Sequence, residues 1–192
     1  MFLLTKPDRY AVQQFLDDRV NDHYSYPEIG ATASDAPSGY NIDRNRLRLG
    51  VGIEVFEHGK TAIREWKMFD LGWVELISID IPIETGQTVA ILVSHYGFYS
   101  LNAARIVYTI NEPNKFGFAY GTLTEHGEIG EERFSVEYNA DSDEVWYDIF
   151  AFSRPAALLA KIGYPISRSL QKAFAQDSKM AMQRAVSQAK NS

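Results

Sequence analysis

Strict alternation of apolar and polar residues marks the first predicted strand. From Arg46 to Phe56, Leu47 and Leu49 fall on one face and Arg46 and Arg48 on the other, which is typical of a half-buried strand. About six strand-like runs follow, separated by short breaks that are rich in turn-forming residues. Parallel neighbours need long crossovers, so these breaks predict an antiparallel meander. The runs are Trp73–Ile79, Thr88–Tyr96, Ala104–Asn111, Phe116–Thr124, Glu131–Tyr138 and Val145–Ser153.

Helical spacing appears at both ends of the chain. Residues 7–20 carry Val12, Phe15 and Leu16 on one stripe, and Thr5 is placed to cap this first helix. A short helix is predicted over Thr61–Met68. Apolar residues at steps of four or seven predict a long helix from Pro165 to about Gln188.

The order of these elements predicts an α+β fold. A curved antiparallel sheet of about seven strands would wrap around the long C-terminal helix, as in the helix-grip fold, with an additional N-terminal helix. Folds of this type usually enclose a cavity between sheet and helix. At 192 residues we expect a single domain over 1–192. Its parts would be an N-terminal helix and loop (1–45), the strand, short helix and meander (46–154), and the terminal helix (155–192).

Composition limits the classes of function. Hydrophobic residues are 45% and charged residues 23% of the chain, as in globular proteins. The absence of cysteine excludes disulfides, cysteine nucleophiles and thiolate metal sites. A net charge of −6 argues against non-specific nucleic-acid binding. The apolar start, Met1–Leu4, is too short for a signal peptide and the uncharged stretch 85–104 too polar for a membrane span, so we expect a cytoplasmic protein.

Neither a metal nor a cofactor motif stands out. His23, His58, His95 and His126 lack the spacing of a helical or hairpin metal site. No phosphate-binding loop, nucleophile elbow or complete dinucleotide-binding glycine motif is present. We therefore expect no metal and no cofactor.

The run from Phe116 to Leu123 alternates large and small residues. Gly117, Ala119 and Gly121 share one face, so another element or a ligand can approach the backbone closely there. We expect the C-terminal helix to pack on this small-residue face, with a ligand as the alternative.

Glu132 is predicted to point inward. It has the parity of Phe134, whereas Glu131 and Arg133 have the opposite parity and should point outward. An inward carboxylate needs a partner, because an isolated buried charge is costly. On the last strand, Asp148 and Arg154 share a face with Trp146, but both faces are apolar, so parity alone leaves the inward face open. We predict a Glu132–Arg154 pair inside; it is either a structural ion pair or part of a site.

Several blocks resemble the DUF1990 family, a domain of unknown function found in bacteria and plants. The resemblance extends over nearly the whole chain and is carried by blocks in the same order: Phe2–Pro7, Gly30, Gly39–Tyr40, Trp66, Phe116–Leu123, His126, Gly130–Phe134, Val145–Ile149, Phe152–Pro155, and Arg168, Gln171 and Phe174 in the last helix. The resemblance implies a fold and little about activity. The related START-type and birch-pollen-allergen-type proteins mostly bind apolar small molecules, which is an analogy at the level of the fold.

Three functions remain open. The first is a binding protein for a small apolar or amphipathic ligand held between sheet and C-terminal helix. The second is a cyclase- or hydrolase-type enzyme that uses Glu132 as general acid or base. The third is a non-catalytic interaction protein, since residues 155–192 hold six Lys or Arg against one Asp. The candidate ligand-binding residues are Tyr120, His126, Glu132, Phe134, Asp148, Arg154 and Arg168.

Overall fold

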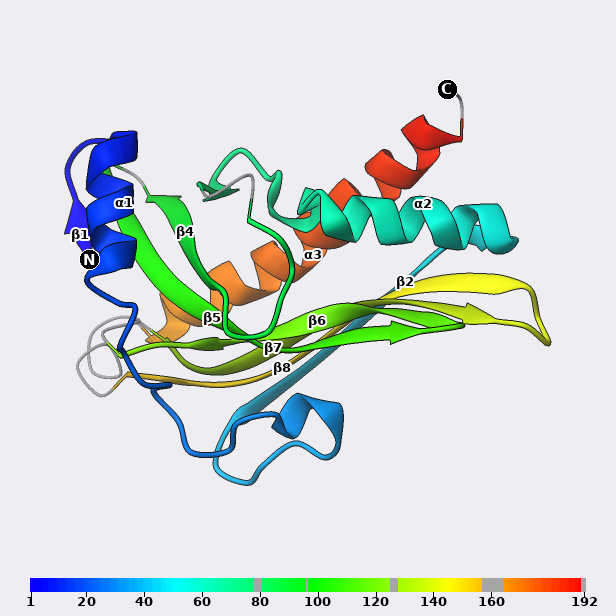
Figure 1. Ribbon diagram of the computed structural model, residues 1–192, viewed down its shortest axis with the longest axis horizontal. Helices are drawn as coiled ribbons and strands as arrows, with labels where there is room; N and C mark the ends of the chain where they lie inside the picture. The colour runs from blue at the N-terminus through cyan, green and yellow to red at the C-terminus, as the bar shows by residue number, and fades with distance from the viewer. Residues whose placement is uncertain (78–80, 96, 125–127, 157–163, 191–192) are drawn as a thin grey trace.

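The computed structural model describes residues 1–77, 81–95, 97–124, 128–156 and 164–190 (Figure 1). The described chain contains three α-helices, two short 3-10 turns and eight strands. The helices and turns are α1 (Arg9–Asp17), η1 (Ala31–Ala33), α2 (Ile53–Arg64), η2 (Lys67–Phe69) and α3 (Tyr164–Ala189). The strands are β1 (Phe2–Leu3), β2 (Asn41–Val51), β3 (Val74–Leu76), β4 (Thr88–His95), β5 (Phe98–Glu112), β6 (Lys115–Thr122), β7 (Glu128–Asn139) and β8 (Glu144–Pro155).

The strands form one curved antiparallel sheet, as predicted. Their order is β2-β8-β7-β6-β5-β4-β3, and β1 pairs with β5 outside this path. Both α2 and α3 lie against one side of the sheet, which we call the helix face, while η1 and its flanking loops lie on the other side, the loop face (Figure 1). The α+β architecture with a long C-terminal helix is therefore confirmed.

The first predicted strand ends earlier than expected. Residues 53–56 are the first turn of α2, and the predicted short helix at Thr61–Met68 is replaced by the end of α2 and by η2. Gly52 turns the chain at φ +96°, a conformation that favours glycine. From Ile53 onward Val55, Phe56, Gly59, Ala62 and Ile63 are buried at helical spacing, so packing onto the sheet selects a helix over the alternating pattern.

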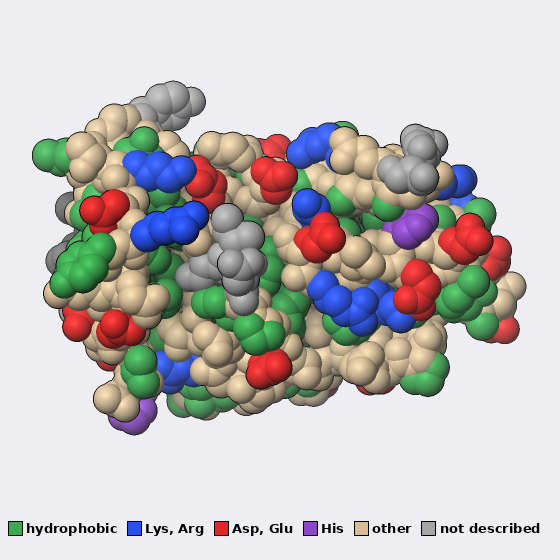
Figure 2. Space-filling view, turned by 45° about the horizontal axis from the view of Figure 1, so that its top comes forward, with side chains coloured by type: hydrophobic (Ala, Val, Ile, Leu, Met, Phe, Trp, Pro, Cys, Tyr) green, Lys and Arg blue, Asp and Glu red, His purple; other side chains and the backbone are tan. Residues whose placement is uncertain are grey.

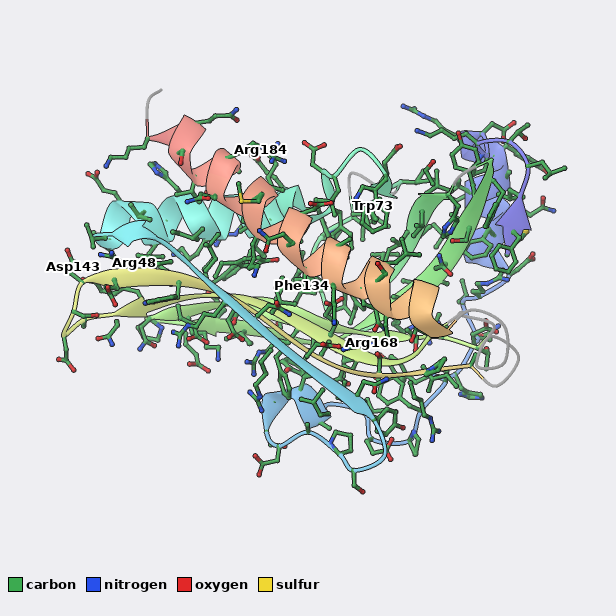
Figure 3. All side chains as sticks on the ribbon, turned by 180° about the vertical axis from the view of Figure 1, so that it is seen from behind. Arg48, Trp73, Phe134, Asp143, Arg168 and Arg184 are labelled. Atoms are coloured by element: carbon green, nitrogen blue, oxygen red, sulfur yellow. The ribbon has the colours of Figure 1, made fainter. Side chains whose placement is uncertain are left out.

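The main core lies between the helix face and the two helices. Phe118 and Phe134 are fully buried on the sheet, with ring centroids 5.6 Å apart. Phe69 from η2 lies 5.6 Å from Phe134, and Phe174 from α3 lies 5.5 Å from Phe69. Figure 3 shows Phe134 pointing from the sheet toward α3. Aromatic packing thus joins sheet, turn and helix into one unit.

The small-residue face of β6 does not receive the C-terminal helix, which corrects the expectation. Tyr24 and Tyr26 of the N-terminal segment lie there instead. A Cβ added at Gly121 would be 2.0 Å from the Tyr26 hydroxyl oxygen, so only glycine permits this approach. Tyr26 also packs edge-on against Phe152, with centroids 5.5 Å apart. The loop face is therefore partly buried by a segment far away in sequence.

The N-terminal helix begins later than predicted. Asp8, rather than Thr5, caps α1 and accepts a hydrogen bond from the Ala11 N–H at 2.8 Å. Val12 and Phe15 of α1 pack with Leu92 and Leu101 in a second, smaller core. This core lies at the β4–β5 end of the sheet.

Charges of both signs are interspersed on the face that carries α1 and α2 (Figure 2). That face presents no broad field of one sign. In the described part of the chain, none of the helices is both long and apolar enough to cross a membrane.

Candidate functional site

Glu132 lies on the helix face, as its parity predicted. The Tyr120 hydroxyl donates a hydrogen bond to its Oε2 at 2.8 Å, and the two residues are direct cross-strand partners. No Lys, Arg or His of the described ranges forms an ion pair with Glu132. Glu132 is half-buried, and Tyr120 is its single hydrogen-bond partner among the described residues.

The surroundings change the acidity of both groups. Burial raises the pKa of Glu132 to about 7; the Tyr120 hydrogen bond opposes this, and the nearby Asp43 carboxylate adds to it. Burial and the neighbouring Glu132 raise the pKa of Tyr120 well above its ordinary value. Glu132 can therefore change its protonation state near neutral pH while Tyr120 stays protonated.

A row of four residues crosses the sheet at this point. Strand register aligns Tyr120 with Glu132, Glu132 with Ala151, and Ala151 with Asp43. Ala151 separates the two acids, whose backbones are two strand spacings apart, about 10 Å. Ala151 is only half-buried, although its strand β8 is flanked by β2 and β7. The row thus holds two carboxyl groups separated by a small residue that is partly exposed to solvent.

The first half of α3 lies over this row. Arg168, labelled in Figure 3, comes from this half of the helix. It forms a bidentate ion pair with Asp43, with Nη2 at 2.9 Å from Oδ1, and Gln171 donates to Ser153 Oγ at 2.9 Å. Leu170 and Phe174 are half-buried, whereas the second half of the helix is anchored by buried Ala181, Met182 and Val186, among others. Among the described side chains of α3, those from Arg168 to Phe174 are therefore less buried than those farther along.

The structure separates the other predicted residues from this site. Asp148 and Arg154 lie on the loop face, because β8 directs Tyr147 and its alternates toward α3. Asp148 pairs with Arg133 at 2.9 Å, and Arg154 is exposed, its guanidinium over the Tyr40 ring. The predicted Glu132–Arg154 pair is wrong, because the two side chains lie on opposite faces. His126 falls outside the described residues.

Parity predicts that Glu131 points outward, and it does lie on the loop face, opposite Glu132, yet it is only 2% exposed. Its carboxylate accepts hydrogen bonds from the Tyr26 hydroxyl at 2.7 Å, the Gly30 N–H at 2.7 Å and the Thr32 N–H at 2.9 Å, and also from the Thr32 hydroxyl. These donors all belong to the N-terminal segment. Glu131 therefore fastens this segment to the loop face.

The sequence contains a signal for the position of Asp43 but none for the role of Glu131. Asp43 has the parity of Leu47 and Leu49, so extending the alternation back from Arg46 would have placed it on the helix face. The role of Glu131 carries no such signal. Parity gives its face, but no local pattern shows that residues 24–32 cover that face.

Two surface hollows are lined entirely by described residues, and both lie outside the space between sheet and α3. One lies beside Phe2 and Phe98, and the other lies between α1 and residues 86–88. Within the described ranges, no group of three His, Asp or Glu is placed to hold a metal ion.

Comparison with known proteins places the chain in a family. A model described as a domain of unknown function (DUF1990) matches residues 25–181. A UPF0548 protein of Dictyostelium discoideum is 35% identical over all of this chain and 98% of its own length. One from Deinococcus radiodurans is 34% identical over 90% of this chain and 92% of its own. A START superfamily protein from Mycobacterium smegmatis aligns at TM-score 0.51 and 12% identity, over 79% of this chain and 99% of its own. The chain therefore belongs to the DUF1990 family and has the START-like helix-grip fold.

Proposed function

We propose that the protein binds a small amphipathic molecule between the helix face and the first half of α3. The observation that carries this proposal is Glu132, a half-buried carboxyl group without an ionic partner in the described chain, set in aromatic surroundings. Binding sites for small molecules commonly combine apolar walls with a few polar groups that orient the ligand. Phe134 and Phe174 would contact the apolar body, and Glu132 and Tyr120 the polar end.

The packing indicates where the ligand would enter. Phe69, Phe134 and Phe174 are in ring contact, so a bound molecule must separate Phe174 from the sheet. Among the described side chains in the first half of α3, Leu170 and Phe174 are half-buried, and Arg168 and Gln171 make polar contacts with the sheet. Polar contacts of this kind stabilise less than a packed apolar interface, so we infer that the helix shifts here when a ligand binds.

Calorimetric titration with 1-decanol, below its solubility limit, tests the proposal. We expect saturable binding at one site per chain in the wild type. In Ala151→Leu, which fills the space between the two acids, affinity should fall at least about tenfold, or about 1.4 kcal/mol. Ala140→Leu, in an exposed turn at the far end of β7, serves as the matched control and should bind as the wild type does. Absence of saturable binding, or equal binding by Ala151→Leu, would refute the proposal.

A proton-transfer enzyme is the second candidate. It is favoured by one observation, a carboxyl group whose pKa is raised to about 7 beside a tyrosine hydroxyl. If a bound ligand is converted, the rate should change through one ionisation near pH 7. Glu132→Gln should abolish both this ionisation and turnover while the ligand still binds. Turnover that persists in Glu132→Gln would exclude this role for Glu132.

A further inference from the structure

The charged groups that face the space above Ala151 come from several elements. Asp43 comes from β2, Glu132 from β7 and Arg168 from α3, and the hydroxyls of Tyr120 and Tyr147 come from β6 and β8. Arg168 is already engaged by Asp43 and also donates to Gln171 Oε1 at 2.7 Å. Tyr147 is hydrogen-bonded to Ser178 at 2.9 Å. Of these groups Glu132 has the most unused bonding capacity.

The Glu132 carboxylate can accept further hydrogen bonds. An ionised carboxylate can accept about four hydrogen bonds, and within the described chain Glu132 accepts one, from Tyr120. A bound group that donates hydrogen bonds would meet this capacity. A second carboxylate would meet two acids in the same row, an unfavourable arrangement of like charges.

The chain itself shows that the row accepts a cation. Arg168 occupies the Asp43 end of the row as a bidentate ion pair, while the Glu132 end has no cation from the described residues. Ala151 between them contributes only a methyl group beside Glu132 and is itself partly exposed to solvent. An ammonium group there would form an ion pair with Glu132, as Arg168 does with Asp43.

We propose that the ligand of this site is an amphipathic amine whose protonated nitrogen pairs with Glu132 above Ala151. This inference rests on the proposed function and specifies its ligand class. Tyr120 would hold the carboxylate in place, and the aromatic side chains would contact the apolar body.

Binding of an amine here is coupled to the ionisation of Glu132. Burial holds the pKa of the free carboxyl near 7, and an adjacent cation lowers it, because the ion pair favours the charged form. A primary alkylamine itself stays protonated at neutral pH, as lysine does. Amine binding should therefore strengthen as pH rises through the pKa of Glu132, whereas binding of an alcohol should not.

Calorimetric titration with decylamine, 1-decanol and decanoate, at about pH 5.5 and 8.0, tests this inference. At the higher pH we expect decylamine to bind at least about tenfold more tightly than decanol, and this ratio to fall roughly tenfold at the lower pH. In Glu132→Gln the amine should lose its advantage while decanol binding changes less than about threefold. Glu112→Gln, an exposed site with the same change in net charge, controls for general attraction of amines to an acidic protein and should keep the preference.

The outcomes separate the two proposals. If none of the three compounds binds saturably, the proposed function itself fails. If decanol binds but decylamine binds no better, or decanoate binds best, only the assignment of an amine fails. An amine preference that survives in Glu132→Gln would also overturn the assignment, because the selectivity would then lie elsewhere.

Discussion

Glu131 and Glu132 are adjacent in the chain and lie on opposite faces of the same strand. On the loop face, Glu131 receives four hydrogen bonds from one segment and is almost completely buried. On the helix face, Glu132 receives one hydrogen bond from the described residues and is half-buried next to the small, partly exposed Ala151. A carboxylate saturated with donors from its own chain has little capacity left for a ligand, whereas one with a single donor keeps most of it. The contrast distinguishes a structural acid from a candidate binding group.

Removing the Glu131 carboxylate should have the largest effect on stability. Glu131→Ala leaves the Tyr26 hydroxyl, the Gly30 N–H and both Thr32 donors without their acceptor. We expect the free energy of unfolding to fall by about 3–5 kcal/mol in urea denaturation. Glu112→Ala, at an exposed position on β5, should change it by less than about 0.5 kcal/mol. A loss below about 1 kcal/mol for Glu131→Ala would mean that residues 24–32 are not fastened in this way.

Removing the Glu132 carboxyl group should raise the free energy of unfolding instead of lowering it. The pKa of Glu132 is raised in the fold to about 7, so between its unfolded value and 7 the folded state binds more protons than the unfolded state. Stability contributed by this group therefore decreases as pH rises over that range and is constant above it. Relative to wild type, Glu132→Gln should gain about 2–3 kcal/mol of stability between pH 4 and pH 8. Glu112→Gln should show no such pH-dependent gain, and a flat difference for Glu132→Gln would remove the evidence for an unfavourable charge.

A substitution at Gly121 should disturb the loop face alone. The Cβ of Gly121→Ala would clash with the Tyr26 hydroxyl, and we expect a loss of about 1–3 kcal/mol. In a Tyr26→Phe background the same change should cost less, because the atom closest to the new methyl group is gone. The affinities for decylamine and decanol should be unchanged in Gly121→Ala, both alone and combined with Tyr26→Phe. Equal losses in the two backgrounds would mean that the strain arises elsewhere.

The smallest expected effect is the coupling between Glu132 and Arg154. The two residues lie on opposite faces, so a double-mutant cycle with Glu132→Gln and Arg154→Ala should give additive stabilities within about 0.5 kcal/mol. Arg154→Ala alone should cost less than about 1 kcal/mol, because its guanidinium is exposed over Tyr40. Coupling above about 1 kcal/mol would restore the pair that the sequence suggested.

Two features can be predicted from the sequence by simple strand geometry: the antiparallel sheet and the position of Glu132 on its inner face. Alternation with period two places Glu132 beside Phe134, and short breaks force antiparallel neighbours. It does not decide which face of β8 is inward, since Trp146, Phe150 and Phe152 are as apolar as the residues opposite. The decision comes from long-range packing, because Tyr26 and Tyr40 bury Phe152 on the loop face. The same long-range contact explains why the buried Glu131 was not foreseen.

The ionisation of Glu132 is the most direct test of this contrast. Titration of the side-chain carboxyl carbons by ¹³C NMR, with the Glu132 resonance identified by its loss in Glu132→Gln, should give a pKa of about 7 in the free protein. A saturating amine should move it to lower pH. A pKa near 4.3, the value for an exposed glutamate, would contradict the account, because Glu132 would then be neither desolvated nor lacking a partner.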